Sequence, residues 1–333
     1  MGKLETKTHV SVPGRVCLAG ENIDWISGPV LTAALDSLRT SVEVGSILGK
    51  QVLIHYGHPF NGSDQFDLDQ KYNYGRASTD YVKAVLATLS NIGYKLDGLS
   101  IDINSSLPAS GGLASSGSFC VALVAAANAH YGFNMDERRV AEVAYIAEKE
   151  EMGIGCGQMD QYAVSLGGLL YLNCSSRPPE IQQLQSKDDV VLIVGDTGKL
   201  MRFSGIGLEL KRRLEKKDPF LMQYVTKTEE AIQQARQRLA TDDWNPNDIG
   251  EIVNSCHEYI RDYKQISNPI LEDYIHAARE AGAYGAKSTG ARSEGGCMFA
   301  LCSHEQSGKI AEAIISCGGK AFISPIAKTG IKY

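Results

Sequence analysis

The residues best suited to chemistry lie in a loop of small side chains at residues 108–117, PASGGLASSG, which we call the central loop. It leads directly into an almost uncharged run from Ser118 to His130, which predicts a buried helix. Small side chains let a backbone approach a ligand closely, and the first N–H groups of a helix attract anions. The hydroxyls of Ser115 and Ser116 could bind phosphate oxygens or a hydrated magnesium ion. The pattern indicates a phosphate-binding loop; its alternative is an ordinary Ser/Gly loop before a buried helix.

Two further glycine-rich segments, far apart in the sequence, are bordered by polar residues. They are residues 13–24, PGRVCLAGENID, and residues 285–296, GAKSTGARSEGG. Any one of the three segments could be a turn, but together they indicate a cleft around a phosphorylated ligand. The central loop lacks the Gly-Lys-Ser/Thr order of a Walker A loop.

The elements that must position these segments follow an α+β pattern with two domains, residues 1–180 and 181–333. The polar, proline-containing segment 175–188 is the expected boundary. The first domain is expected to contain two short strands in 7–19 broken at Pro13-Gly14, a hairpin of 40–48 with 51–56, helices at 78–92, 118–130 and 134–151, and strands at 99–103 and 168–173. The second is expected to contain strands at 190–194, 297–301 and 321–323 and helices near 207–216, 221–240, 248–263, 269–281 and 305–317.

Composition limits the class of protein. The chain has 333 residues, of which 43% are hydrophobic and 22% charged, as is ordinary for a soluble globular protein. A formal net charge of −6 argues against a general nucleic-acid binder. The eight cysteines are scattered without zinc-site spacing, which predicts neither disulfides nor a metal cage. The sequence has neither a membrane-spanning apolar run nor a signal-peptide core, so we expect a cytoplasmic protein without a membrane partner.

The glycine-rich segments carry a specific resemblance. Residues 108–118 match, in register, the second motif of the GHMP kinases, the superfamily of galactokinases, homoserine kinases, mevalonate kinases and phosphomevalonate kinases. Residues 13–35 resemble the first motif in its galactokinase form, and residues 147–161 resemble the galactokinase stretch ending Cys-Gly-x-Met-Asp-Gln. Residues 285–297 resemble the third, glycine-rich motif. The resemblance implies an N-terminal domain like ribosomal protein S5 domain 2, a ferredoxin-like C-terminal domain, and ATP bound between them.

The resemblance also implies roles for individual residues. Asp160 matches the aspartate that serves as base for the substrate hydroxyl, and Arg15 matches the basic residue beside it. Ser116 and Glu148 match the ligands of Mg²⁺. The alternatives are a helix-capping carboxylate for Asp160 and an exposed helix carboxylate for Glu148. The residues expected to bind ATP are Pro108, Ser110, Gly111, Gly112, Leu113, Ala114, Ser115, Ser116, Gly117 and Ser118.

Three residues of the first motif, Glu21, Asn22 and Asp24, are expected to bind the substrate. Glu21 and Asp24 match the carboxylates that hold sugar hydroxyls in galactokinases, an arrangement that rejects analogues lacking those hydroxyls. Asn22 stands where galactokinases have His, and Trp25 where they have Tyr, so the resemblance does not fix the sugar. The third motif departs at residues 291–294, where Arg292 could add an anion contact.

These features predict an ATP- and magnesium-dependent sugar kinase of the galactokinase branch, a monomer or homodimer. The expected acceptor is the anomeric hydroxyl of galactose or of a related sugar, such as a uronic acid or an amino sugar. One alternative is a mevalonate kinase, against which the polyol-binding residues 20–25, GENIDW, argue. Another is a regulatory protein that senses sugar and ATP on the same fold, against which the intact Asp160 and Ser116 argue.

Overall fold

The computed structural model describes residues 7–75, 77–108, 111–199, 206–290 and 295–333. The N-terminal elements are β1 (Thr8–Ala19), the 3-10 turn η1 (Asp24–Ile26), β2 (Pro29–Ser46), β3 (Gln51–Tyr56), β4 (Gly62–Asp67), α1 (Ser78–Asn91), β5 (Leu99–Ser105), α2 (Ser115–Tyr131), α3 (Glu137–Ile146), the π-helical turn η2 (Ala147–Glu151), α4 (Met159–Leu166), β6 (Leu169–Asn173) and β7 (Glu180–Leu184). The C-terminal elements are β8 (Val190–Asp196), α5 (Ile206–Glu215), α6 (Pro219–Arg238), α7 (Pro246–Tyr259), the π-helical turn η3 (Ile260–Lys264), α8 (Pro269–Glu280), β9 (Gly285–Thr289), β10 (Cys297–Ser303), α9 (Ser307–Ser316) and β11 (Lys320–Pro325).

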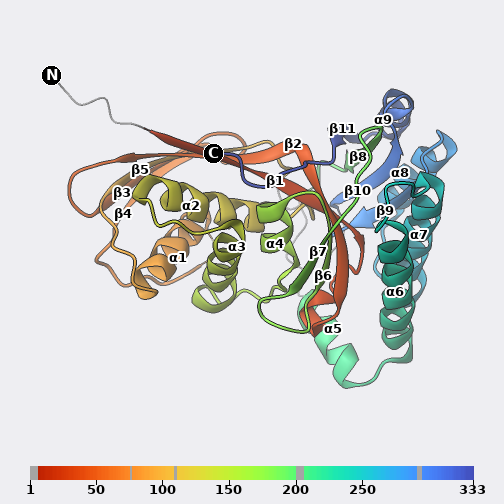
Figure 1. Cartoon of the computed structure of the whole chain (residues 1–333), viewed down its shortest axis with the longest axis horizontal. Coiled ribbons are helices and arrows are strands. Elements are labelled where there is room, and N and C mark those ends of the chain that lie inside the picture. The colour runs from red at the N-terminus through yellow and green to blue at the C-terminus, as the bar shows by residue number, and fades with distance from the viewer. Residues whose placement is uncertain (1–6, 76, 109–110, 200–205, 291–294) are drawn as a thin grey trace.

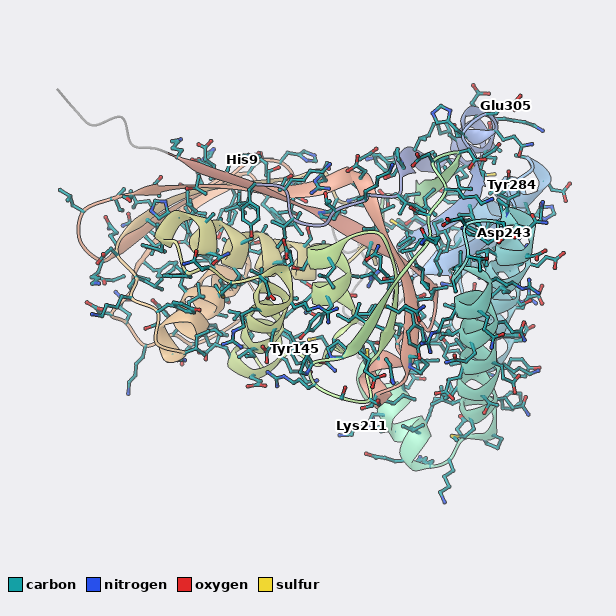
Figure 2. All side chains as sticks on the ribbon, in the orientation of Figure 1. His9, Tyr145, Lys211, Asp243, Tyr284 and Glu305 are labelled. Carbon is teal, nitrogen blue, oxygen red and sulfur yellow. The ribbon has the colours of Figure 1, made fainter. Side chains whose placement is uncertain are left out.

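The N-terminal domain is a mixed sheet with its helices on one face (Figure 1). The strands lie in the order β4-β3-β5-β2-β6-β7, and β1 pairs with β2. The predicted central helix is confirmed as α2, which contacts β1, β2, α1, α3 and α4. Every residue from Gly117 to Asn128 is buried, because a helix that is apolar on all sides has no face to turn to water. Figure 2 shows side chains filling the space between sheet and helices, with His9 labelled on the sheet and Tyr145 in the helical layer.

Two predictions about this sheet are wrong. β1 is one continuous strand, because a shift of register at Pro13/Gly14 absorbs the irregularity without breaking the pairing with β2. β2 and β3 do not form a hairpin, since β5 lies between them, antiparallel to β2 and parallel to β3. Burial alternates along β5, as expected for a strand in a sheet that helices cover on one face.

The C-terminal sheet has the order β11-β8-β10-β9, with all its pairs antiparallel. This order arises when a β-α-β-β-α-β chain places its last strand beside its first, so the predicted ferredoxin-like domain is confirmed. One face packs on α8 and α9, through residues such as Ile193, Ile275 and Ile310. The other face packs on α6 and α7, through residues such as Val194, Ile232 and Val253. Figure 1 shows these helices standing beside the sheet.

The N-terminal sheet extends past residue 180 and ends inside the segment 175–188 that was expected to contain the boundary. β7 pairs antiparallel with β6 and therefore belongs to the N-terminal sheet, which extends to Leu184. The end of the chain also returns to that domain, with bridges from Ile326 to Leu35 and from Lys332 to Ser11. In the described ranges, no helix is both long and apolar enough to cross a lipid bilayer.

The two domains meet through backbone contact between the central loop and the end of β9. Gly112, at φ +79°, lies so close that an added Cβ would be 2.4 Å from the Thr289 carbonyl oxygen. The reverse holds for Gly290, at φ +81°, where a Cβ would lie 2.3 Å from the Gly112 Cα. Only glycine permits this approach, because any side chain would force the two backbones apart.

We expect Gly112→Ala to lower the urea midpoint of unfolding much more than Gly132→Ala. Both glycines have left-handed backbones, and that conformation alone costs alanine about 1–2 kcal/mol. Only Gly112 also faces a close backbone, since a Cβ on Gly132 would meet nothing within 4 Å. Equal midpoints for the two variants, measured by circular dichroism, would show that the contact between Gly112 and the end of β9 tolerates a side chain.

Candidate active site

The central loop is held in place by its own carbonyl groups. The Gly111 carbonyl accepts the N–H of Cys297, and the Leu113 carbonyl accepts the N–H of Arg15, both at 3.0 Å. Ala114 then takes a left-handed conformation, φ 60°, before α2 begins. The first N–H groups of α2 thus follow a fixed turn, where the helix dipole favours an anion.

Arg15 links the central loop to Asp160. Its Nε and Nη2 donate to Asp160 Oδ1 at 2.9 and 2.5 Å, and its Nη1 donates to the Gly112 carbonyl at 2.6 Å. The Arg15 side chain is 4% exposed and that of Asp160 is 29% exposed, so the cation is buried while the carboxylate reaches the surface of the site. Burial lowers the pKa of Arg15, but the charges of Asp160 and Glu21 outweigh burial and the pKa is raised.

Asp160 is not a helix cap. It lies in the first turn of α4, which starts without a side-chain cap, and its carboxylate binds Arg15 instead. Its distance from α2 depends on Gly117, where an added Cβ would lie 3.0 Å from the Asp160 Cβ. The start of α2, which is predicted to bind phosphate, and the Asp160 carboxylate at the start of α4 therefore lie together.

Asp24, in η1, is buried near Asp160. Its Oδ2 accepts the N–H of Met159 at 3.2 Å, and its Oδ1 is buried without a partner among the described residues. Gly157 makes room for it, because a Cβ there would lie 1.8 Å from Oδ2. Burial first, and then the charge of Asp160, raise the pKa of Asp24 to about 7. An unpartnered buried acceptor costs about 1–3 kcal/mol, so this site favours a ligand that supplies a hydroxyl donor.

Glu148, in η2, is 3% exposed and is therefore not the exposed helix carboxylate of the alternative interpretation. Gln161 Nε2 donates to its Oε2 at 2.6 Å, and the Ser116 hydroxyl lies close enough to lower the pKa of Glu148. Burial raises the pKa of Glu148 to about 7, although Ser116 and Gln161 oppose the shift. The structure thus brings together the two predicted Mg²⁺ ligands.

Glu21 does not face open space. It is 1% exposed; its Oε2 accepts Lys287 Nζ at 2.6 Å, and its Oε1 accepts the N–H of Gly290. Burial raises the pKa of Glu21, but Lys287, Arg15 and Lys264 outweigh it and the pKa is lowered. Both carboxylate oxygens thus already accept a donor inside the protein, and the role of Glu21 toward a sugar hydroxyl stays a prediction.

The C-terminal domain supplies residues that the sequence did not single out. Lys264 Nζ donates to the Glu21 carbonyl at 3.0 Å and to Asn22 Oδ1 at 2.5 Å, and the Tyr224 hydroxyl donates to the same carbonyl at 2.8 Å. Lys264 and Lys287 are 1% and 0% exposed. The sequence signal that could have identified Lys287 is its position within a run of small residues, 285–289, which forms a buried strand. A charged side chain there needs a buried partner.

The other residues predicted to bind ATP occupy different environments. The Ser118 hydroxyl is buried and donates to the Val12 carbonyl at 3.0 Å, so its side chain belongs to the core and not to a nucleotide site. Half-buried positions are Pro108, Gly112, Ser115 and Ser116, and buried positions are Gly111, Leu113, Ala114 and Gly117. Ser110 and Arg292 lie outside the described residues.

The donor groups fit a magnesium ion that is shared with phosphates. Within the described ranges, no cluster of three or more His, Cys, Asp or Glu side chains is suited to hold a metal ion by itself. Mg²⁺ is commonly held by one or two carboxylates together with phosphates and water. Ser116, at the start of α2, and Glu148, in η2, offer one hydroxyl and one carboxylate, and phosphates and water would complete the coordination. The pair would hold the ion only together with a phosphorylated ligand.

Comparison with known families gives two matches. The GHMP kinases N terminal domain matches residues 80–168, and the GHMP kinases C terminal domain matches residues 244–320. Both matches agree with the division into two domains seen in the structure.

Relatives and solved structures cover almost the whole chain. A galactokinase of Pyrococcus furiosus is 30% identical over 93% of each chain, and a mevalonate kinase of Thermococcus sibiricus is 27% identical over 97% of each. The crystal structure of Lactococcus lactis galactokinase complexed with galactose is 20% identical, with a TM-score of 0.84 over 98% of this chain and 95% of that one. The Methanococcus jannaschii mevalonate kinase structure, also 20% identical, has a TM-score of 0.80 over 96% and 98%. The chain therefore belongs to the GHMP kinases, a family of ATP-dependent phosphotransferases.

Proposed function

We propose that this protein transfers the γ-phosphoryl group of ATP to a hydroxyl group of a sugar. The acceptor is the anomeric hydroxyl of galactose or of a related sugar. The observation that carries the proposal is the meeting of Asp160, buried Arg15 and the unpartnered Oδ1 of Asp24 beside the start of α2. A galactokinase relative that is 30% identical over 93% of the chain supports the same acceptor class.

Asp160 acts as the general base. Arg15 contacts Oδ1, which leaves Oδ2 outside that contact to accept the proton of the sugar hydroxyl. As the proton leaves, the sugar oxygen forms a bond to the γ-phosphorus, and the bond from that phosphorus to the β–γ bridging oxygen breaks to give ADP. Arg15 stabilises the negative charge that develops, and it does so from a fixed position in a buried environment.

Ser116 and Glu148 would hold Mg²⁺, which would neutralise charge on the β- and γ-phosphates. The start of α2 would bind phosphate oxygens through backbone N–H groups and its dipole. The Asp24 carboxylate would accept a second hydroxyl of the sugar and so orient the reacting one.

A second candidate, mevalonate phosphorylation, is supported by relatives such as the Thermococcus sibiricus mevalonate kinase, 27% identical over 97% of the chain. The carboxylates near Asp160 favour a neutral sugar over mevalonate and, for the same reason, over a uronic acid. Asp24 is already close enough for the charge of Asp160 to raise its pKa, and a third carboxylate there would be repelled.

We expect ADP release from Mg-ATP with galactose or a related sugar and little with mevalonate. A coupled ADP assay over hexoses, uronic acids, amino sugars and mevalonate measures this preference, and phosphorus NMR of the product identifies the phosphorylated hydroxyl. Preference for mevalonate would establish the second candidate. Calorimetric binding of Mg-ATP without ADP release for any acceptor would instead indicate a sensing protein.

Asp160→Asn should lower kcat by about 10²- to 10⁴-fold, because the amide cannot accept the proton. Affinity for Mg-ATP, measured by calorimetry, should stay within about threefold, since Asp160 pairs with Arg15 and not with the phosphate-binding end of α2. Unchanged kcat would remove Asp160 from the role of base.

Binding of Mg-ATP should release protons at pH 7. With a pKa of about 7, Glu148 is roughly half protonated there, and a metal ligand must lose its proton. Affinity should therefore fall as pH drops from 8 to 6. Calorimetry in buffers of different ionisation enthalpy should show roughly half a proton less released by Glu148→Gln than by the wild type.

The control for that measurement is Glu150→Gln on the same turn, whose carboxylate pairs with Arg177 at the surface. The control should release as many protons as the wild type. Equal release by all three proteins would exclude Glu148 as the metal ligand.

A further inference from the structure

A buried ion pair joins the first and third motifs across the two domains. Lys287, on β9, is 0% exposed, and its partner Glu21 is 1% exposed. The three protons of the Lys287 ammonium have three acceptors: Glu21 Oε2 at 2.6 Å and the carbonyls of Cys17 and Ser288, each at 2.7 Å. The lysine is therefore fully satisfied inside the protein, and a ligand is not needed to explain it.

The contacts of this pair lead to the reacting groups along two short routes. On one side, Lys287 binds the Cys17 carbonyl, two residues along β1 from Arg15, and the Cys17 N–H donates to Thr289 Oγ1 at 3.2 Å. On the other side, Glu21 binds the N–H of Gly290.

Gly290 in turn abuts Gly112, whose carbonyl accepts Arg15 Nη1 at 2.6 Å. The second route therefore ends at the guanidinium that holds Asp160, and the first ends on β1, two residues from Arg15. A displacement of β9 by a fraction of an ångström would move the strand that carries Arg15 and the carbonyl that orients it.

We propose that Lys287 and Glu21 form a positioning pair for phosphoryl transfer, which holds Arg15 and Asp160 in register with the central loop. The proposal rests on the proposed function and gives Glu21 a role in this pair. Neither residue touches the reacting atoms. Their effect is on kcat, because misplacement of reacting groups by about 1 Å can cost about a hundredfold in rate.

The test uses a neutral double variant, Glu21→Gln with Lys287→Met. Replacing only one partner would leave an uncompensated buried charge, which would destabilise the fold and obscure any effect on positioning. The same double substitution is also made in the Asp160→Asn background. A matched surface control is Lys50→Met with Asp97→Asn, which removes an exposed ion pair of 3.0 Å between the β2–β3 and α1–β5 connections. Unfolding temperatures are recorded for every variant, and assays are run at least 15 °C below the lowest of them.

We expect the neutral double variant to lower kcat about a hundredfold in the wild-type background and less than threefold in the Asp160→Asn background. The KM for sugar should change less than threefold, and the surface control should keep the wild-type kcat. Equal losses in both backgrounds would show a merely structural role, because independent effects add. A raised KM for sugar with unchanged kcat would make Glu21 a sugar ligand and overturn the proposal.

Hydrogen exchange of the Arg15 Nε–H, followed by nitrogen-15 NMR and assigned with Arg15→Lys, gives a readout that does not depend on turnover. We expect exchange at least tenfold faster in the neutral double variant than in the wild type, because the contact with Asp160 Oδ1 loosens. Unchanged exchange would overturn the proposal. If the wild type phosphorylates no acceptor, the proposed function fails, and the exchange rates still decide whether the pair positions Arg15.

Discussion

The buried guanidinium of Arg15 is the constraint on which the site depends. A cation inside a protein must be fully paired, and Arg15 takes its partners from two elements, the carbonyl of Gly112 and the carboxylate of Asp160. Because the guanidinium is planar and rigid, it fixes the angle between these partners as well as their distance. The proposed phosphate-binding end of α2 and the proposed base are thereby held in fixed positions relative to each other before any ligand binds.

The site contains two buried carboxyl groups whose ionisation destabilises the folded protein. Asp24 and Glu148 are both buried, and each has a pKa raised to about 7 chiefly by burial, so the folded protein binds their protons more tightly than the unfolded chain does. The penalty for ionising them grows as pH rises from about 4 to 7. Such strained carboxylates are common where a ligand or metal later supplies the missing partner. Glu148 and Lys264 also lie on π-helical turns, a local irregularity often found at functional sites.

Most helices and strands and the motif residues could be predicted from the sequence, but contacts between residues distant in the chain could not. An almost uncharged run predicted α2, and apolar patterns predicted the elements of the C-terminal domain except β9. The motifs named Arg15, Asp160, Ser116 and Glu148 before the structure brought them together. The order β3-β5-β2 was missed because strand pairing depends on partners distant in the chain and not on the short link between β2 and β3. Lys287 was missed for the same reason, since Glu21 lies 266 residues away.

The most direct measurement of the central claim is a crystal structure of the protein with a bound sugar and a non-hydrolysable ATP analogue. The account predicts the terminal phosphates at the start of α2 and the acceptor hydroxyl about 3 Å from Asp160 Oδ2. Arg15 should still bind Oδ1 in that complex. An acceptor hydroxyl beyond hydrogen-bond reach of Asp160, or an analogue bound away from the central loop, would contradict it.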